Sequence, residues 1–256
     1  MLPSPHRLYV HDDLSDDLRA RFGDGSPVVR LAGELLEAVI RNGPRVQLLT
    51  LEAQLAALVA RGAHAPFART LAIGPAGERV ARALNARTGW FPTVRMIGLT
   101  REEDGQGGYT LVSTTDEPLP AQVGDLDAVS SVAVVDDTVY SGLTMGAVLA
   151  ALPAPVRART QAFCLRAVAE SLDKVGKLCP VEAGFVAHGR LLEDVSFINA
   201  SGLVMRGAIR RTGRAPLAFY ERPAWIHAWF PGDGNEVIAR CRELRALLGQ
   251  PDLAVR

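Results

Sequence analysis

Lysine and cysteine are both scarce in this chain of 256 residues. Lys174 and Lys177 are the only lysines, so nearly all of the positive charge is arginine. Catalysis through a Schiff base needs a lysine amine, and it is therefore not expected unless one of these two lies in the site. Arginine side chains and backbone amides must bind any phosphate. The three cysteines have no metal-ligand spacing, which argues against a disulfide framework or a zinc site.

An excess of charge of one sign is also absent. Lys and Arg together number 28, as do Asp and Glu, so the formal net charge at pH 7 is zero. No global field draws the protein toward nucleic acid or an anionic membrane, and any anion site must be local. No apolar run approaches the ~18 residues of a membrane span, and the first residues lack the apolar core of a signal peptide. We expect a cytoplasmic protein with reduced thiols.

Units of a strand followed by a helix repeat through the middle of the chain. Short apolar runs bounded by turn residues predict strands, and apolar residues at helical spacing predict helices. The predicted strands are Leu8–Val10, Thr70–Ile73, Pro92–Leu99, Ser131–Val135, Thr160–Ala167 and Val181–His188. The predicted helices are Val28–Arg41, the later part of 46–63, Glu78–Thr88, Thr144–Leu152 and Asn235–Leu248. This alternation predicts an α/β fold with a mostly parallel sheet flanked by helices.

Two other regions differ from this alternation. Arg101–Gly108 is polar and rich in glycine, which predicts a mobile loop, and Tyr109–Ser113 fits the returning arm of a hairpin. The region after about residue 190 contains six of the 15 Phe, Trp and Tyr residues, together with glycines and prolines. We expect one domain over 1–256, with a core at about 46–190 and an irregular cap, or hood, formed by 191–256 and by 1–45.

The residues with the clearest chemical character follow the predicted strand Ser131–Val135. Asp136 and Asp137 come directly after it, and two adjacent carboxylates repel each other unless they meet hydroxyl groups or a metal ion. A ribose 2,3-diol offers a pair of hydroxyl donors. The turn into the next helix supplies backbone amides, hydroxyls and the positive end of a helix dipole for a phosphate. The residues of this turn are Thr138, Val139, Tyr140, Ser141, Gly142, Leu143 and Thr144.

Carboxylates for a sugar and an anion cradle a few residues later together predict a site for ribose 5-phosphate, built on 134–144. In the alternative interpretation, Asp136 and Asp137 only cap the turn after the strand, where aspartate is common.

The segment Val-Val-Asp-Asp-Thr-Val-Tyr-Ser-Gly-Leu-Thr at 134–144 resembles the signature of the type I phosphoribosyltransferases. That signature is a hydrophobic strand, two acidic residues and a loop that ends in Thr/Ser-Gly-x-Thr. The resemblance covers roughly 46–190 and implies phosphoribosyl pyrophosphate (PRPP) as the ligand. Asp136 and Asp137 would then hold the ribose hydroxyls, and residues 138–144 would surround the 5-phosphate. Tyr140 departs from the signature, which more usually has a small hydroxyl residue at this position.

The resemblance also implies the reaction. The phosphoribosyl group would pass from PRPP to a nucleobase or related heterocycle, with release of pyrophosphate. Mg²⁺ would be held mainly by PRPP, near Asp136 and Asp137, and these two aspartates with Arg101 would be the catalytic residues. Folds of this kind are often dimers, so a homodimer is also expected.

Two further segments resemble parts of the same family. The family's first core strand ends in a loop that holds pyrophosphate, and the matching residues here are Pro75, Ala76, Gly77, Glu78 and Arg79. Ordinary turn chemistry would explain this segment equally well. Residues 100–113 lie where the family has a mobile loop that closes over the reaction. Many relatives have Arg-Lys-Glu there, whereas this chain has Arg101-Glu102-Glu103 and lacks the lysine.

The aromatic segment near the C-terminus loosely resembles segments that help to hold the base in some purine phosphoribosyltransferases. Trp225, Trp229 and Phe230 are the candidates for base binding, because aromatic rings stack on flat heterocycles. Packing in a hydrophobic core is the alternative for the same three residues.

Three functions stay open on the sequence. The first is a nucleobase phosphoribosyltransferase, and the second is a phosphoribosyltransferase of specialised biosynthesis with a non-purine acceptor. The third is a regulatory protein that senses PRPP without turning it over, which the missing loop lysine favours. The neutral charge and the absence of a clear helix-turn-helix in 1–45 argue against nucleic acid as a partner. The sequence does not identify the acceptor.

Overall fold

The computed structural model describes residues 6–41 and 43–249. The chain divides into two compact units. The first unit comprises Met1–Leu51, Glu103–Gly108 and Glu193–Arg256, and the second comprises Glu52–Glu102 and Tyr109–Leu192. Each unit has its own hydrophobic core. None of the helices in the described part of the chain is long and apolar enough to cross a membrane.

The first unit contains a three-stranded parallel sheet in the order β10-β1-β2. Its strands are β1 (Arg7–Asp12), β2 (Val46–Thr50) and β10 (Val195–Asn199). Its helices are α1 (Ser15–Phe22), α2 (Pro27–Ile40), η1 (Gly43–Arg45), α9 (Ala200–Val204), η2 (Phe219–Glu221), α10 (Pro223–Trp229) and α11 (Gly234–Leu248). The side chain of Ser26 caps α2 by accepting the backbone N–H of Val29, and the apolar face of α2 packs against α11.

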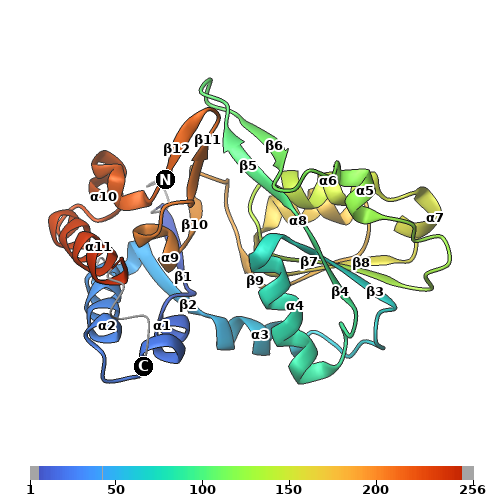
Figure 1. The fold of residues 1–256 in the computed structure, drawn as a ribbon, viewed down its shortest axis with the longest axis horizontal. Coiled ribbons are helices and arrows are strands. Elements are labelled where there is room, and N and C mark those ends of the chain that lie inside the picture. The colour runs from blue at the N-terminus through green and yellow to red at the C-terminus, as the bar shows by residue number, and fades with distance from the viewer. Residues whose placement is uncertain (1–5, 42, 250–256) are drawn as a thin grey trace. The chain divides into compact units, whose positions relative to one another are not determined.

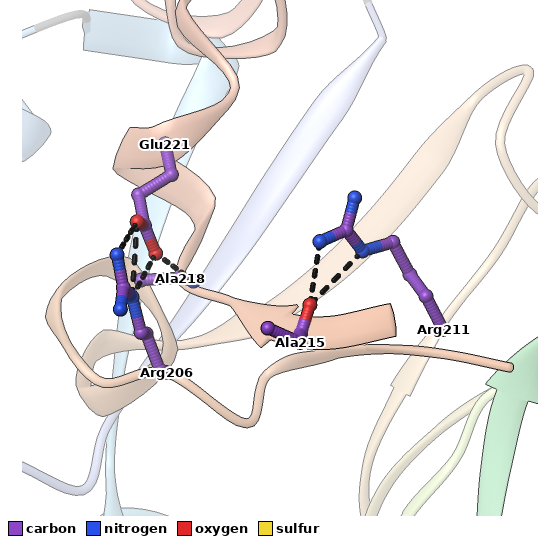
Figure 2. A network of polar contacts seen from close by, with 5 residues as sticks. All are labelled: Arg206, Arg211, Ala215, Ala218 and Glu221. Carbon is purple, nitrogen blue, oxygen red and sulfur yellow. Dashed lines mark hydrogen bonds and ion pairs between the residues drawn. The ribbon is translucent and has the colours of Figure 1, made fainter. Parts of the chain in front are cut away.

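Strands β11 (Ile209–Arg211) and β12 (Arg214–Leu217) form an antiparallel ribbon in the same unit. Figure 2 shows how side chains fix the chain near this ribbon. The Arg211 guanidinium donates to the Ala215 carbonyl, and the Glu221 carboxylate binds Arg206 while it accepts the backbone N–H of Ala218. These bonds hold the segment that leads from β12 into η2.

The second unit is built on a five-stranded sheet in which all neighbouring strands are parallel, in the order β4-β3-β7-β8-β9. Its strands are β3 (Arg69–Ile73), β4 (Val94–Ile97), β7 (Val132–Val139), β8 (Thr160–Val168) and β9 (Val181–Ala187). The helices are α3 (Leu51–Val59), α4 (Gly74–Thr88), α5 (Leu119–Val123), α6 (Leu143–Ala151), α7 (Ala154–Arg157) and α8 (Ala169–Gly176). Figure 1 shows these helices around the sheet. The predicted α/β fold with mostly parallel sheets flanked by helices is confirmed.

The strand order places a topological reversal between β3 and β7. β3 comes first along the chain, β4 lies on one side of it, and β7, β8 and β9 follow on the other side. In open parallel sheets, ligands bind beyond the carboxyl ends of the strands at such a reversal. β3 ends at Ile73 and β7 ends at Val139, so the residues around these two ends share one edge of the sheet. We call this edge the switch-point edge.

Two predicted boundaries next to this edge are wrong. β7 runs to Val139 rather than ending at Val135, because β8 is equally extended and pairs with it as far as Val139 and Ala167. α4 begins at Gly74 rather than at the predicted Glu78, so residues 74–77 form the first turn of this helix. Proline suits that turn because its missing N–H would have no partner within the helix.

The predicted loop Arg101–Gly108 is wrong for its first three residues, which belong to β5 (Leu99–Glu103). Polar side chains do not prevent a strand here, because the neighbouring strand β6 (Tyr109–Ser113) pairs with the backbone of β5. The turn between them is closed by a hydrogen bond from the Asp104 N–H to the Gly108 carbonyl. The predicted returning arm at Tyr109–Ser113 is confirmed.

Gly77 brings α4 against the backbone of β7. A Cβ at this position would lie 2.6 Å from the Val135 carbonyl oxygen and 3.3 Å from the Asp136 Cα. Both neighbours are backbone atoms of a central strand, so they cannot move aside without disturbing the sheet. The close approach of α4 to the switch-point edge therefore requires glycine.

We expect Gly77→Ala to lower the free energy of unfolding by about 1–3 kcal/mol through this overlap. Gly146→Ala in α6 is the matched control, because a Cβ there meets no atom within 4 Å. This variant should gain about 0.5–1 kcal/mol, since alanine loses less backbone entropy in a helix. Urea unfolding measures both changes, and equal effects of the two substitutions would contradict the packing role of Gly77.

Candidate functional site

The switch-point edge brings together three segments of the second unit. The first turn of α4 follows β3 and contains Pro75, Ala76 and Gly77. The end of β7 carries Asp136 and Asp137, and the loop at 140–142 leads from it into the N-terminus of α6. Two helix N-termini therefore begin at one sheet edge, and each offers free backbone amides and a partial positive charge to an anion.

Asp136 is buried, and its Oδ1 accepts the backbone N–H of Asp137 at 2.8 Å. Burial raises the pKa of the Asp136 carboxyl well above its ordinary value, and the negative charge of Asp137 raises it further. Arg101 acts on this pKa in the opposite direction, by a smaller amount. The site therefore favours a neutral Asp136, which can donate a hydrogen bond as well as accept one.

Asp137 lies in a different environment. Its Oδ2 accepts from Arg166 Nη2 at 2.9 Å, and the Arg166 side chain, on β8, is only 1% exposed. The Gln54 Oε1 accepts from the same guanidinium at 3.4 Å. The positive charge of an arginine at this distance favours the ionised form of the neighbouring carboxylate. Arg166 was missed in the sequence analysis, although an arginine inside the apolar predicted strand Thr160–Ala167 was a signal that could have found it.

The loop into α6 is fixed by its own backbone and by α8. Gly142 has a φ of +79°, which favours glycine, and it directly precedes α6. The Ser171 Oγ on α8 donates to the Tyr140 carbonyl at 2.7 Å. The Ser141 Oγ accepts the Leu143 N–H at 3.4 Å. An open cavity of about 400 Å³ adjoins this loop, lined by Ser141, Gly142, Leu143, Gly146, Lys174, Val175 and Leu178.

Arg101 also belongs to this group of residues. It lies on β5, and its guanidinium carbon is 5.6 Å from the ring centroid of Tyr109 and 5.6 Å from that of Tyr140. Both distances are within the range of cation–π contacts. Two of the residues that the family resemblance assigned to pyrophosphate lie further along α4: Glu78 binds Arg82 at 2.6 Å, and Arg79 is exposed.

The C-terminal aromatic residues lie in the first unit. Phe230 has no exposed surface, and Trp229 is buried in the same hydrophobic core. Trp225 is partly buried and stacks on Phe219 with ring centroids 4.6 Å apart. Their burial favours the packing role over base stacking.

The described residues contain no group of three or more His, Cys, Asp or Glu side chains that could hold a metal ion. At the end of β7, Asp136 favours its protonated form, whereas the Asp137 carboxylate pairs with Arg166. Mg²⁺ commonly combines one or two carboxylates with oxygens of bound phosphates. The chain therefore suits Mg²⁺ only if a phosphorylated ligand supplies most of the oxygens.

Neither a protein-family model nor a curated protein matches the sequence. Among solved structures, a purine phosphoribosyltransferase from Pyrococcus horikoshii is 17% identical, with a TM-score of 0.36 over 74% of this chain and 92% of that chain. A xanthine-guanine-hypoxanthine phosphoribosyltransferase from Helicobacter pylori is 18% identical, with a TM-score of 0.35 over 57% and 86%. A hypothetical protein from Neisseria gonorrhoeae with bound ppGpp is 16% identical, with a TM-score of 0.39 over 64% and 84%. Similarity this low establishes neither a family nor an activity.

We expect Asp136→Asn to become more stable relative to the wild type as the pH rises. The raised pKa of Asp136 stabilises the fold at low pH, and this contribution is lost as the pH rises from 3.8 through the pKa of the folded state. Asparagine does not ionise and keeps an oxygen for the Asp137 N–H. The difference in free energy of unfolding should change by about 1 kcal/mol or more between about pH 4 and about pH 8. If urea unfolding gave the same difference between the variant and the wild type at every pH, burial would not raise the pKa of Asp136 in the folded state.

Arg166→Met should lower the free energy of unfolding by about 3 kcal/mol, because Asp137 then lacks its compensating charge. The double variant Arg166→Met/Asp137→Asn should lose less than the two single variants added together. Arg82→Met, which breaks the exposed pair with Glu78, is the control and should cost at most about 0.5 kcal/mol. Strict additivity in urea unfolding would contradict the coupling of Arg166 to Asp137.

Proposed function

We propose that the chain is a phosphoribosyltransferase, which transfers the 5-phosphoribosyl group of PRPP to a heterocyclic acceptor and releases pyrophosphate. One observation supports this above the others. The segment 134–144, which resembles the PRPP-binding signature, lies at the topological reversal of a parallel sheet, where a helix N-terminus follows each of the two strands. This is the position at which such sheets bind phosphorylated ligands.

In the proposed complex, the two helix N-termini bind the two phosphate-bearing ends of PRPP. The backbone amides at the start of α6, with the hydroxyls of Ser141 and Thr144, bind the 5-phosphate. The amides of Ala76 and Gly77 at the start of α4 bind the pyrophosphate. β3 and β7 are adjacent, so one ligand can reach both helix ends.

The two aspartates then have different roles toward the ribose. A neutral Asp136 can donate to one hydroxyl of the diol and accept from the other. Asp137, kept ionised by Arg166, places negative charge near a sugar ring that becomes positive in the transition state. The same carboxylate stays oriented by its bond to Arg166, so little reorganisation accompanies the reaction.

In the reaction, the bond between the anomeric carbon and a pyrophosphate oxygen breaks, and the electron pair leaves with pyrophosphate. A nitrogen of the acceptor forms the new bond to the anomeric carbon, and the proton of its N–H is released to solvent. The chain contributes mainly positioning and electrostatic stabilisation. Arg101 donates to the departing pyrophosphate. Mg²⁺ bound to PRPP would neutralise part of the leaving group's charge.

A PRPP-sensing protein that does not catalyse the transfer is the second candidate. The carboxylate of Asp137 is already engaged by Arg166, and the segment 100–113 contains no lysine. Both features are compatible with binding that does not lead to turnover. Release of pyrophosphate separates the two candidates, because a sensor binds PRPP without releasing it. The first candidate function is compatible with either a purine or a non-purine acceptor.

The test measures PRPP binding by calorimetry with Mg²⁺, and pyrophosphate release with a panel of purine, pyrimidine and other heterocyclic acceptors. Asp137→Asn should lower turnover by about 100-fold or more, because it removes the negative charge opposite the sugar. Asp127→Asn, which changes an exposed aspartate in the same unit, should have no effect. Circular dichroism and urea unfolding verify that Asp137→Asn stays folded at the assay temperature. Absence of PRPP binding by the wild type would refute the proposed function, and binding without release would favour the sensor.

A further inference from the structure

Arg101 lies beside two tyrosines that come from different parts of the second unit. Tyr109 is the first residue of β6, and Tyr140 follows the last residue of β7. The guanidinium carbon of Arg101 is 5.6 Å from the centroid of each ring. Arg101 also affects the pKa of Asp136, so its charge acts on the carboxyl-bearing end of β7. The hairpin β5–β6 is thereby connected to the loop that precedes α6.

Tyr140 is the residue at which this chain departs from the PRPP-binding signature. A small hydroxyl side chain at this position could donate to a phosphate. It has no aromatic ring, however, and so could not make the cation–π contact with Arg101. The segment that contains Arg101 is also the one that lacks a lysine. The two departures are connected in the structure, because the residue that replaces the small one contacts the remaining basic residue of that segment.

We propose that Tyr140 and Tyr109 are positioning residues that hold the Arg101 guanidinium ready for the pyrophosphate end of the ligand. This inference rests on the proposed function. The contact with aromatic rings restricts the flexible arginine side chain before the ligand arrives, while its N–H donors stay available for phosphate oxygens. A preorganised donor loses less entropy on binding than one that moves freely. With the tyrosine pair in place, a single arginine binds the pyrophosphate, whereas many relatives have an additional lysine in this segment.

The tyrosine hydroxyls have no part in this mechanism, which makes phenylalanine the conservative variant. Tyr140→Phe and Tyr109→Phe keep the aromatic face, whereas Tyr140→Leu and Tyr109→Leu remove it. Tyr109 is 52% exposed, so Tyr109→Leu tests the contact with little risk to the fold. Tyr140 is half-buried, and its carbonyl bond to Ser171 does not involve the side chain.

The experiment compares the affinities of three probes, which are PRPP with Mg²⁺, inorganic pyrophosphate and ribose 5-phosphate. Each leucine variant should weaken PRPP and pyrophosphate by about 3- to 10-fold, as expected for loss of a cation–π contact. In Tyr109→Leu, binding of ribose 5-phosphate should change by less than about 2-fold, because Tyr109 lies outside the loop 138–144 that is proposed to surround the 5-phosphate. The phenylalanine variants should match the wild type. Arg101→Gln should weaken pyrophosphate binding, and Tyr140→Leu should add nothing further in that background.

A second measurement does not depend on the ligand. The Arg101 Nε–Hε signal in NMR, assigned by its loss in Arg101→Gln, should be sharp and shifted by the rings in the wild type and in Tyr140→Phe. In Tyr140→Leu this shift should diminish. Unchanged signals together with unchanged pyrophosphate affinity in both leucine variants would overturn the inference. If the wild type binds neither PRPP nor pyrophosphate while the NMR shift behaves as expected, the proposed function fails and the positioning of Arg101 stands.

Discussion

The parallel pairing of β7 between β3 and β8 is the constraint on which the candidate site depends. Pairing with β3 sets the starts of α4 and α6 at one edge of the sheet, and Gly77 lets α4 approach the backbone of β7. Pairing with β8 brings Thr138 opposite Arg166, and the same register sets the guanidinium against Asp137. A shift of one residue in either pairing would reverse the faces of the side chains and separate these groups.

The two adjacent aspartates show how one strand end can carry two protonation states. Asp136 lies inside the unit, where burial and the charge of its neighbour favour the neutral form. Asp137 meets a buried arginine, whose positive charge favours the ionised form. Two full negative charges on consecutive residues would repel each other. The different surroundings of the two carboxylates, rather than the distance between them, reduce this repulsion. The pair therefore combines a hydrogen-bond donor with a negative charge, which suits a diol on a sugar that becomes positively charged.

Much of the second unit follows from local patterns. The contiguous apolar run before Asp136 predicts a buried strand, and glycine with a positive φ before α6 fits the predicted turn. The boundaries that were wrong depend on partners far away in the chain. β7 extends to Val139 because β8 pairs with it, and β5 forms from polar residues because β6 and the turn at 104–108 complete its hydrogen bonds. A short stretch of sequence around each boundary does not contain these distant partners.

Hydrophobic spacing and turn residues act over short distances. They are sufficient to predict the α/β class, the order of the main strands and helices, and the segment 134–144 as the most informative one. Three other features come from tertiary contacts: Arg166 pairs with Asp137, Arg101 lies beside Tyr109 and Tyr140, and Trp229 and Phe230 pack in a core. Each of these depends on residues that are distant in the chain and meet only after the sheets and helices pack. The raised pKa of Asp136 has mainly the same origin, because burial is its largest cause.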